Sequence, residues 1–244
     1  MNKMIITEAK LFLRDPAGPI FAILLPLALL LGLGSIPGFG EPDPAMGGQR
    51  VIDTQLPGMM VILSVATMAL SVLPGTLVAY RERGVLRRLS TTPVSPVRLL
   101  VAQVVNNLVV AIVATALLIT LGHLFLGVAV PGNLPAFAVV FVLGTASVFG
   151  LGLLIAAVAP NAKVAPGIGS LLMFPLLFMA GMWIPRELMP DLLRRIGDFL
   201  PMAPFGQAIR DTWAGHAPQP LHLAVMAVTV LVTGAVAARL FRWE

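Results

Sequence analysis

Six long runs of apolar residues divide this chain, and short polar or proline-rich segments separate them. A helix needs roughly 20 such residues to cross the hydrocarbon core of a bilayer. The runs are Gly18–Ile36, Leu56–Ala79, Leu99–Phe125, Leu134–Ala159, Pro166–Ile184 and Leu221–Leu240. None contains Asp, Glu or Lys, and Arg occurs only at their ends. The pattern predicts an all-α polytopic membrane protein, with six transmembrane helices in one domain over residues 1–244.

Prolines lie inside three of these runs, at Pro26, Pro74 and Pro175. A proline has no N–H for the helix ladder and its ring crowds the preceding turn, so each predicts a kink.

Amphipathic patterns predict further helices outside the spans. In residues 1–17, the polar residues Lys3, Thr7, Lys10 and Arg14 recur at helical spacing, which indicates a helix lying in the membrane interface. An ordinary positive flank that only fixes orientation is the alternative. In residues 185–220, the stretches MPDLLRRIGDFL and FGQAIRDTW each predict a short amphipathic helix on, or dipping into, the outer leaflet.

The distribution of Lys and Arg predicts the orientation of the spans. Eleven of the 16 lie on the side of the termini, and five lie on the other side. The eleven are Lys3, Lys10, Arg14, Arg81, Arg83, Arg87, Arg88, Arg98, Lys163, Arg239 and Arg242. Because positive loops stay in the cytoplasm, both termini are expected there and residues 185–220 outside.

Composition excludes several classes of function. Hydrophobic residues make up 58% of the chain and the mean hydropathy is +0.94, well above a soluble domain. The chain has no cysteine and no G-x-x-x-x-G-K-[ST] phosphate loop, so we expect no ATPase activity and no bound cofactor of its own. No ionisable residue lies deep within a span, since the Arg and His residues of the runs occur only near their ends, and this argues against proton-coupled transport. His123, His216 and His222 show no metal-ligand spacing, and no basic face indicates nucleic acid.

The segment YRERGVLRRLSTTPVSPVRLL, residues 80–100, concentrates five arginines between the second and third spans. Residues 80–89 are expected to continue the second span inward as a helix. Thr92 before Pro93 ends it, and Ser95 with Pro96 starts the next helix. The pattern predicts a basic helical elbow that docks on a cytoplasmic partner. The alternative is a loop made basic by orientation alone.

This segment resembles the cytoplasmic coupling segment of type-2 ABC exporter permeases. In that family the segment typically shows an acidic residue and Arg-Gly, followed by a Thr-Pro-x-Ser turn. The matching residues are Glu82, Arg83, Gly84, Leu86, Leu89, Thr92, Pro93 and Ser95, while Val85 stands where Thr is common. The stretch FPLLFMAGMWIPRELMPDLLRRIGDFLPMAPFGQAIR is similar to the family's fifth span and re-entrant external helices.

The resemblance implies the permease subunit of an ATP-driven exporter in a bacterial cytoplasmic (inner) membrane. The exporter would also contain a second permease subunit, which is either another copy of this chain or a close homologue. Two copies of a cytoplasmic ABC ATPase subunit, which binds ATP and Mg, would complete the assembly. Residues 80–98 would contact the ATPase through Glu82, Arg83, Arg87 and Arg88, with Gly84 and Pro93 shaping the contact. The substrate pathway would follow the second and fifth spans, past Met60, Thr67, Phe174 and Phe178.

We expect efflux of a hydrophobic substrate such as a drug, since Met, Leu and Phe line the spans. Export of a lipid, glycolipid or polysaccharide is an alternative within the family. A membrane scaffold that binds a cytoplasmic partner without transport, and a secondary carrier, are alternatives from other classes.

Overall fold

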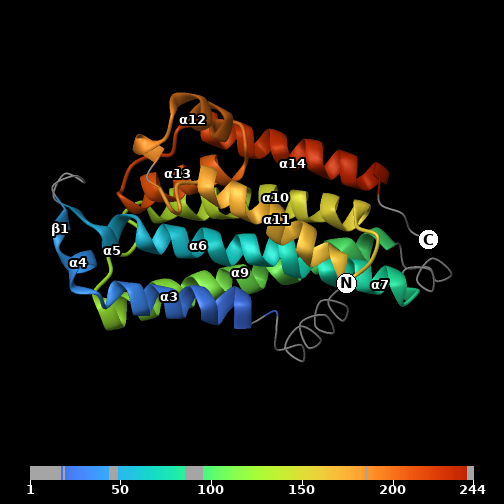
Figure 1. Ribbon diagram of the computed structural model, residues 1–244, viewed down its shortest axis with the longest axis horizontal. Helices are drawn as coiled ribbons and strands as arrows, with labels where there is room; N and C mark the ends of the chain where they lie inside the picture. Colours follow the sequence, from blue (N-terminus) through green and yellow to red (C-terminus); the bar gives the residue numbers. More distant parts are fainter. Residues whose placement is uncertain (1–17, 19, 44–48, 86–95, 185, 241–244) are drawn as a thin grey trace.

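Helices dominate the part of the chain that the computed structural model describes, which is residues 18, 20–43, 49–85, 96–184 and 186–240 (Figure 1). The first half comprises the π-helical turn η1 (Ile20–Leu24), α3 (Leu25–Gly34), α4 (Pro37–Gly40), β1 (Pro42–Asp43), β2 (Gln49–Arg50), α5 (Val51–Thr54), α6 (Leu56–Thr67), the π-helical turn η3 (Met68–Val72) and α7 (Leu73–Glu82). The second half comprises α9 (Pro96–Leu126), α10 (Leu134–Val158), α11 (Val164–Met179), the 3-10 turn η4 (Arg186–Leu188), α12 (Asp191–Asp198), α13 (Met202–Trp213) and α14 (Pro220–Leu240). β1 and β2 form one short antiparallel pair. The predicted all-α membrane fold is confirmed.

The helices follow most of the predicted spans. Among the described residues, four helices are long and apolar enough to cross a bilayer: Leu56–Glu82, Val101–Leu126, Leu134–Val158 and Pro220–Ala237. The first and fifth runs form shorter apolar helices, Ile20–Gly34 and Val164–Met179. The fifth helix is shorter than predicted because Gly181, with φ of 85°, adopts a left-handed conformation that ends it.

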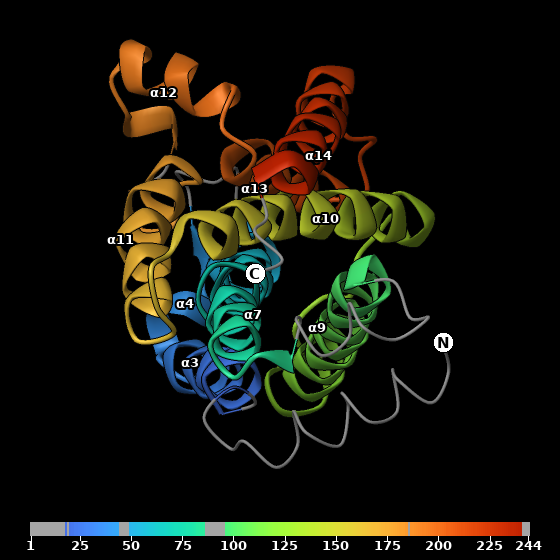
Figure 2. The same cartoon turned by 90° about the vertical axis from the view of Figure 1, so that its right-hand side faces the viewer.

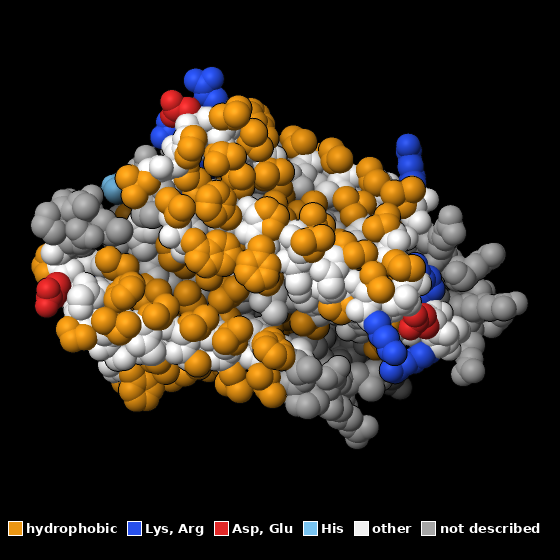
Figure 3. Space-filling view, viewed as in Figure 1, with side chains coloured by type: hydrophobic (Ala, Val, Ile, Leu, Met, Phe, Trp, Pro, Cys, Tyr) orange, Lys and Arg blue, Asp and Glu red, His pale blue; other side chains and the backbone are white. Residues whose placement is uncertain are grey.

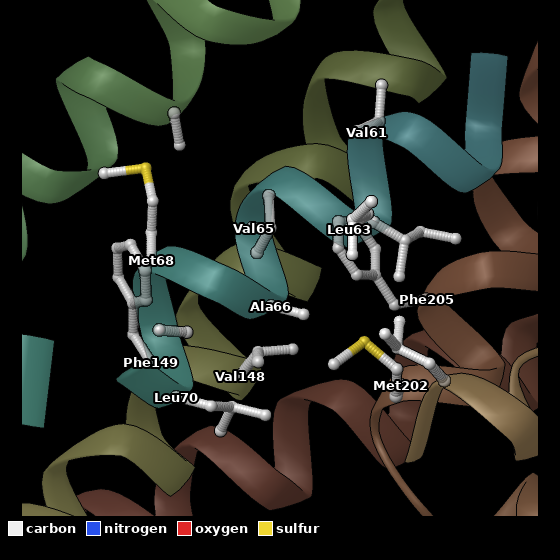
Figure 4. Close-up of a cluster of buried hydrophobic side chains, with 14 of the residues drawn as sticks. Val61, Leu63, Val65, Ala66, Met68, Leu70, Val148, Phe149, Met202 and Phe205 are labelled. Atoms are coloured by element: carbon white, nitrogen blue, oxygen red, sulfur yellow. The ribbon is translucent and has the colours of Figure 1, made fainter. Parts of the chain in front are cut away.

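The second span, α6 through η3 to α7, lies at the centre of the molecule. Figure 2 shows α7 surrounded by α3, α9, α10 and α11. Its side chains form much of the core: Val61, Leu63, Val65, Ala66, Met68 and Leu70 pack with Val148 and Phe149 of α10 and with Met202 and Phe205 of α13 (Figure 4). Movement of this span would therefore reach most other helices.

Two of the three prolines follow directly on a π-helical turn. η1 precedes Pro26 and η3 precedes Pro74, each proline being the second residue of the next α-helix. A wider turn removes the clash between the proline ring and the carbonyl four residues earlier. At Pro175, by contrast, α11 continues as an α-helix.

The two helices predicted within residues 185–220 are present, but they differ in burial. On α12 and beside it, Leu188, Leu192 and Phe199 are exposed, as expected for a helix at a membrane surface. α13 instead lies in the core, where Phe205 and Ile209 are fully buried. Of the two locations expected for this helix, on the outer leaflet or dipping into it, the burial of α13 favours the second. The small residues Ala203, Gly206 and Ala208 allow the neighbouring helices to pack closely around it.

Large apolar side chains cover the outside of the helices, and charges gather towards the ends of the molecule (Figure 3). Leu171, Leu231 and Leu124 are 75%, 72% and 71% exposed. An apolar surface of this extent would be unfavourable in water and is expected against lipid.

Candidate functional site

The C-terminal end of the second span is tied to the connection between α10 and α11. Arg81 donates hydrogen bonds to the carbonyl oxygens of Ala156, at 3.4 Å, and of Ala159. Glu82 Oε1 accepts a hydrogen bond from the Ala162 N–H, at 3.1 Å. We call these two side chains and their three backbone partners the clasp.

The charges of the clasp suit the helix ends that they contact. The Arg81 guanidinium binds carbonyls at the C-terminal end of α10, where the helix dipole is negative. Glu82 accepts from an N–H just before α11, where the dipole is positive. Asn161 completes this connection, because its Oδ1 accepts from the N–H groups of Lys163 and Val164. The clasp therefore ties α7 to two helices at once.

Beyond the clasp the second span ends. Gly84 has φ of 65° and its N–H donates to the Arg81 carbonyl, which closes α7. The prediction that the helix continues unbroken over residues 80–89 is therefore wrong at Gly84. Glu82 and Arg83 are exposed, whereas Arg87, Arg88 and Pro93 lie outside the described residues, as does the segment 1–17.

A cavity of about 460 Å³ lies between the first, second and fifth helical runs, a volume in the range of drug-sized ligand sites. It is lined by Gly18, Phe21 and Leu25, by Leu63, Thr67, Ser71, Val72, Gly75 and Thr76, and by Pro166, Ser170 and Met173. The walls are mainly apolar, with four hydroxyls among them. Thr67 and Thr76 donate to carbonyls of their own helix, at 2.8 and 3.0 Å, which leaves the oxygens able to accept from a ligand.

The predicted pathway residues are only partly brought together. Thr67 lines the cavity, and Met60 is buried at 2% exposure without lining it. Phe174 is 59% exposed and stacks on Trp183, with ring centroids 5.8 Å apart, and Phe178 is half-buried.

Sequence reasoning did not identify Ser170 or Thr76 as cavity residues. The signal that could have found this wall is the stripe of small residues Thr67, Ser71 and Gly75, spaced four apart on one face of the second span. Ser71 Oγ and Ser170 Oγ lie within hydrogen-bond distance of each other, 3.5 Å apart, where the second span and α11 meet at the wall of the cavity.

A second polar region lies at the opposite end of the molecule, around α12, α13 and the start of α14. Arg186 pairs there with Asp198, and Arg210 donates to the Ala180 carbonyl at 3.0 Å. Burial raises the pKa of the Asp211 carboxyl, although nearby His222 and Arg210 act in the opposite direction. In the described residues, no group of three His, Asp or Glu side chains is placed to hold a metal ion.

Asp211→Asn is expected to remove a pH dependence of stability. A carboxyl whose pKa is raised on folding stabilises the folded state at pH values below its unfolded-state pKa, which is 3.8. This stabilisation is lost as the pH rises through the folded-state pKa. The variant should match the wild type near pH 4 and be at least as stable at pH 7. Thermal unfolding of the detergent-purified protein across this range measures the effect. A variant that is less stable at pH 7, with an unchanged pH profile, would contradict it.

The fold and the cavity define a polytopic membrane protein with a mainly apolar chamber between spans. The chain matches the family described as ABC-2 type transporter over residues 3–213, and it belongs to that family. The protein is therefore a transmembrane subunit of an ABC transporter, and the resemblance drawn from its motifs is confirmed.

Three curated relatives support the assignment. The chain is 25% identical over 219 residues to the putative transport permease YvfS of Bacillus subtilis (strain 168), covering 89% of this chain and 87% of the relative. It is 28% identical over 239 residues to the daunorubicin resistance ABC transporter permease protein DrrB1 of Streptomyces coeruleorubidus, covering 95% and 82%. It is 29% identical over 177 residues to the inner membrane transport permease YhhJ of Escherichia coli (strain K12), covering 70% of this chain and only 47% of that relative.

Proposed function

We propose that this chain is the permease subunit of an ATP-driven exporter that moves a hydrophobic, drug-like substrate out of a bacterial cell. The observation that carries the proposal is the cavity between the first, second and fifth helical runs, because it opens among helices that the clasp connects to the inner end of the second span. Membership of the ABC-2 type transporter family is consistent with this role.

The lining of the cavity supports the proposed substrate class. Phe21, Leu25, Leu63 and Met173 offer apolar and adaptable surface, and the hydroxyls of Thr67, Ser71, Thr76 and Ser170 offer a few polar contacts. Such a mixture suits a largely apolar ligand with a small number of polar groups. The relative DrrB1 is named for daunorubicin resistance, which supports the same class.

The proposed assembly contains two copies of a separate ABC ATPase subunit, which bind ATP and Mg, and a second permease subunit. The positive-inside distribution supports cytoplasmic termini in the inner membrane. On this topology residues 80–98 face the ATPase, with Glu82, Arg83, Arg87 and Arg88 at the contact and Gly84 and Pro93 shaping it. The same topology supports one domain over 1–244, with an interfacial helix at 1–17 and residues 185–220 outside.

Ser170→Phe is expected to block the cavity, with Leu171→Phe as its control. Ser170 lines the cavity, whereas Leu171, the next residue of α11, is 75% exposed on the outer surface. For the substrate to enter, the inserted ring must be displaced at a cost of about 1–3 kcal/mol, which corresponds to roughly a 5- to 150-fold loss of transport. The measurement is ATP-dependent daunorubicin uptake into inverted membrane vesicles that contain the co-purified ATPase. A control within about twofold of wild type is expected.

Two results would overturn the proposal. One is purification without any ATPase, and the other is the absence of ATP-dependent flux for daunorubicin and for a panel of hydrophobic cations. Flux of a glycolipid instead would place the chain in the other branch of its family.

A further inference from the structure

A polar pocket lies at the end of the molecule away from the clasp, separate from the cavity between the first, second and fifth helical runs. It has a volume of about 330 Å³ and lies between α12, α13 and the start of α14. The side chains that line it are Arg186, Arg194, Asp198, Gln207, Gln219, Leu221 and His222.

Two of these side chains are buried with polar atoms that lack a partner. Arg186 is 4% exposed, and while one terminal nitrogen contacts Asp198 and the Arg194 carbonyl, its Nε has no hydrogen-bond partner among the described residues. His222 is 5% exposed, and its Nδ1 also has none there. Leaving such groups unpaired is costly, so a ligand that satisfies them would bind favourably.

The composition of the pocket selects the chemistry of that ligand. Five of the six polar side chains that line it can donate hydrogen bonds, and only the Asp198 carboxylate cannot. That carboxylate is already paired with Arg186, and Arg194 pairs with Asp191 through one terminal nitrogen of its guanidinium group. A pocket rich in guanidinium, amide and imidazole donors suits a tetrahedral oxyanion such as phosphate.

The surroundings of the pocket are apolar and favour a lipid as the source of the phosphate. Leu221 lines the pocket at 50% exposure, and Leu192 and Phe199, on α12 and directly after it, are 70% and 71% exposed. Figure 3 shows the charged residues beside α12 directly adjoining the apolar surface. Phosphates of a bilayer lie at such a boundary.

An apolar cavity and the polar pocket are lined by neighbouring residues of one short segment. Asp198 lines the polar pocket, whereas Leu200 and Pro201, in the same connection, line an almost wholly apolar cavity of about 570 Å³ between α10, α11 and α14. One short segment therefore borders space suited to a headgroup and space suited to an acyl chain. We propose that this region binds a phospholipid, with its phosphate group held by Arg186, Arg194 and His222.

The test measures lipid binding to the purified full chain by native mass spectrometry, with dioleoyl phosphatidylglycerol as the probe. Dioleoylglycerol, which lacks the phosphate, and inorganic phosphate are the comparison ligands. Arg194→Gln removes a pocket donor, and Arg195→Gln removes one positive charge from the same helix at an exposed position that does not line the pocket. His222→Phe provides a second pocket variant, and thermal unfolding checks that each variant is folded.

Arg194→Gln and His222→Phe should each weaken phosphatidylglycerol binding about tenfold, while Arg195→Gln leaves it unchanged. Dioleoylglycerol should bind at least about tenfold more weakly than the phospholipid. Equal effects of the two arginine variants, or equal binding of the two lipids, would overturn the site. Binding of inorganic phosphate that is lost in the pocket variants, with no competition from lipid, would show that the ligand is free phosphate and overturn the lipid assignment. None of these readouts depends on transport.

Discussion

Gly169→Ala is expected to prevent the protein from reaching its native packing, whereas Gly167→Ala, two residues away on α11, should be neutral or slightly stabilising. A Cβ atom at Gly169 would overlap the carbonyl group of Leu70 in the neighbouring span. A Cβ atom at Gly167 would meet no atom within 4 Å. Alanine is the better helix former by about 1 kcal/mol, so propensity alone would favour both changes. The steric difference therefore decides whether each substitution stabilises or destabilises the protein.

The clash at Gly169 cannot be relieved by a side-chain rotation, because the neighbouring atoms belong to the backbone of η3. A Cβ at Gly152 of α10 would likewise overlap the carbonyl oxygen of Ala69, on the same turn. Pro74 has no N–H to donate to the Leu70 carbonyl, as an α-helix would require, or to the Ala69 carbonyl, as a π-helix would. The two glycines bring Cα–H groups against these oxygens, a weak but recurrent contact between helices. The wide turn and the two glycines therefore form one packing unit.

The expected loss of stability for Gly169→Ala is about 3 kcal/mol or more, at the upper end for overpacked cores. Size-exclusion profiles and thermal unfolding of detergent-purified protein measure it, with Gly167→Ala purified in parallel. Gly152→Ala should behave like Gly169→Ala. If Gly169→Ala unfolds at the same temperature as its control, the close approach to η3 does not hold the bundle together.

Hydropathy predicted the long spans well because it depends on a property that the bilayer imposes. The predicted run Leu134–Ala159 and the observed Leu134–Val158 differ by one residue, and the run Leu221–Leu240 begins one residue late. Hydropathy could not locate the end of α11, because the left-handed Gly181 interrupts the backbone within a sequence that remains apolar. The sequence pattern could not predict that α13 is buried either, since helix amphipathicity does not distinguish a membrane surface from the protein core.

The candidate site was predicted only in part, for a reason of helix phase and depth. Ser170, which lines the cavity, and the predicted pathway residue Phe174 lie four residues apart on one stripe of α11. The cavity wall lies one turn nearer the clasp than Phe174, because Ser170 approaches Ser71 whereas Phe174 stacks on Trp183. The clasp could not be predicted from a charge pattern, because the partners of Arg81 and Glu82 are backbone atoms rather than opposite charges.

Arg81, which belongs to the clasp, and the exposed Arg83 should have separable roles, and this prediction rests on the proposed function. Arg81→Leu removes the hydrogen bonds to Ala156 and Ala159 and should leave the ATPase bound. Transport is then expected to fall by roughly tenfold or more, since losing a charge-assisted hydrogen bond at a helix end disconnects α7 from α10. Arg83→Ala, an exposed neighbour, should instead weaken ATPase association and leave the clasp intact.

Co-purification of the ATPase, ATP hydrolysis and vesicle transport, measured on the same preparations, distinguish the two variants. Because the chain has no cysteine, Arg81→Cys with Ala162→Cys offers a test of rescue by a short bifunctional cross-linker. Without the cross-linker this variant should lose transport as Arg81→Leu does, and cross-linking should restore it, because a covalent link between α7 and the connection from α10 to α11 replaces the lost hydrogen bonds of Arg81. The clasp has no part in coupling if Arg81→Leu transports normally. It has no role distinct from Arg83 if Arg81→Leu also loses the ATPase, because the two residues would then act at one contact surface.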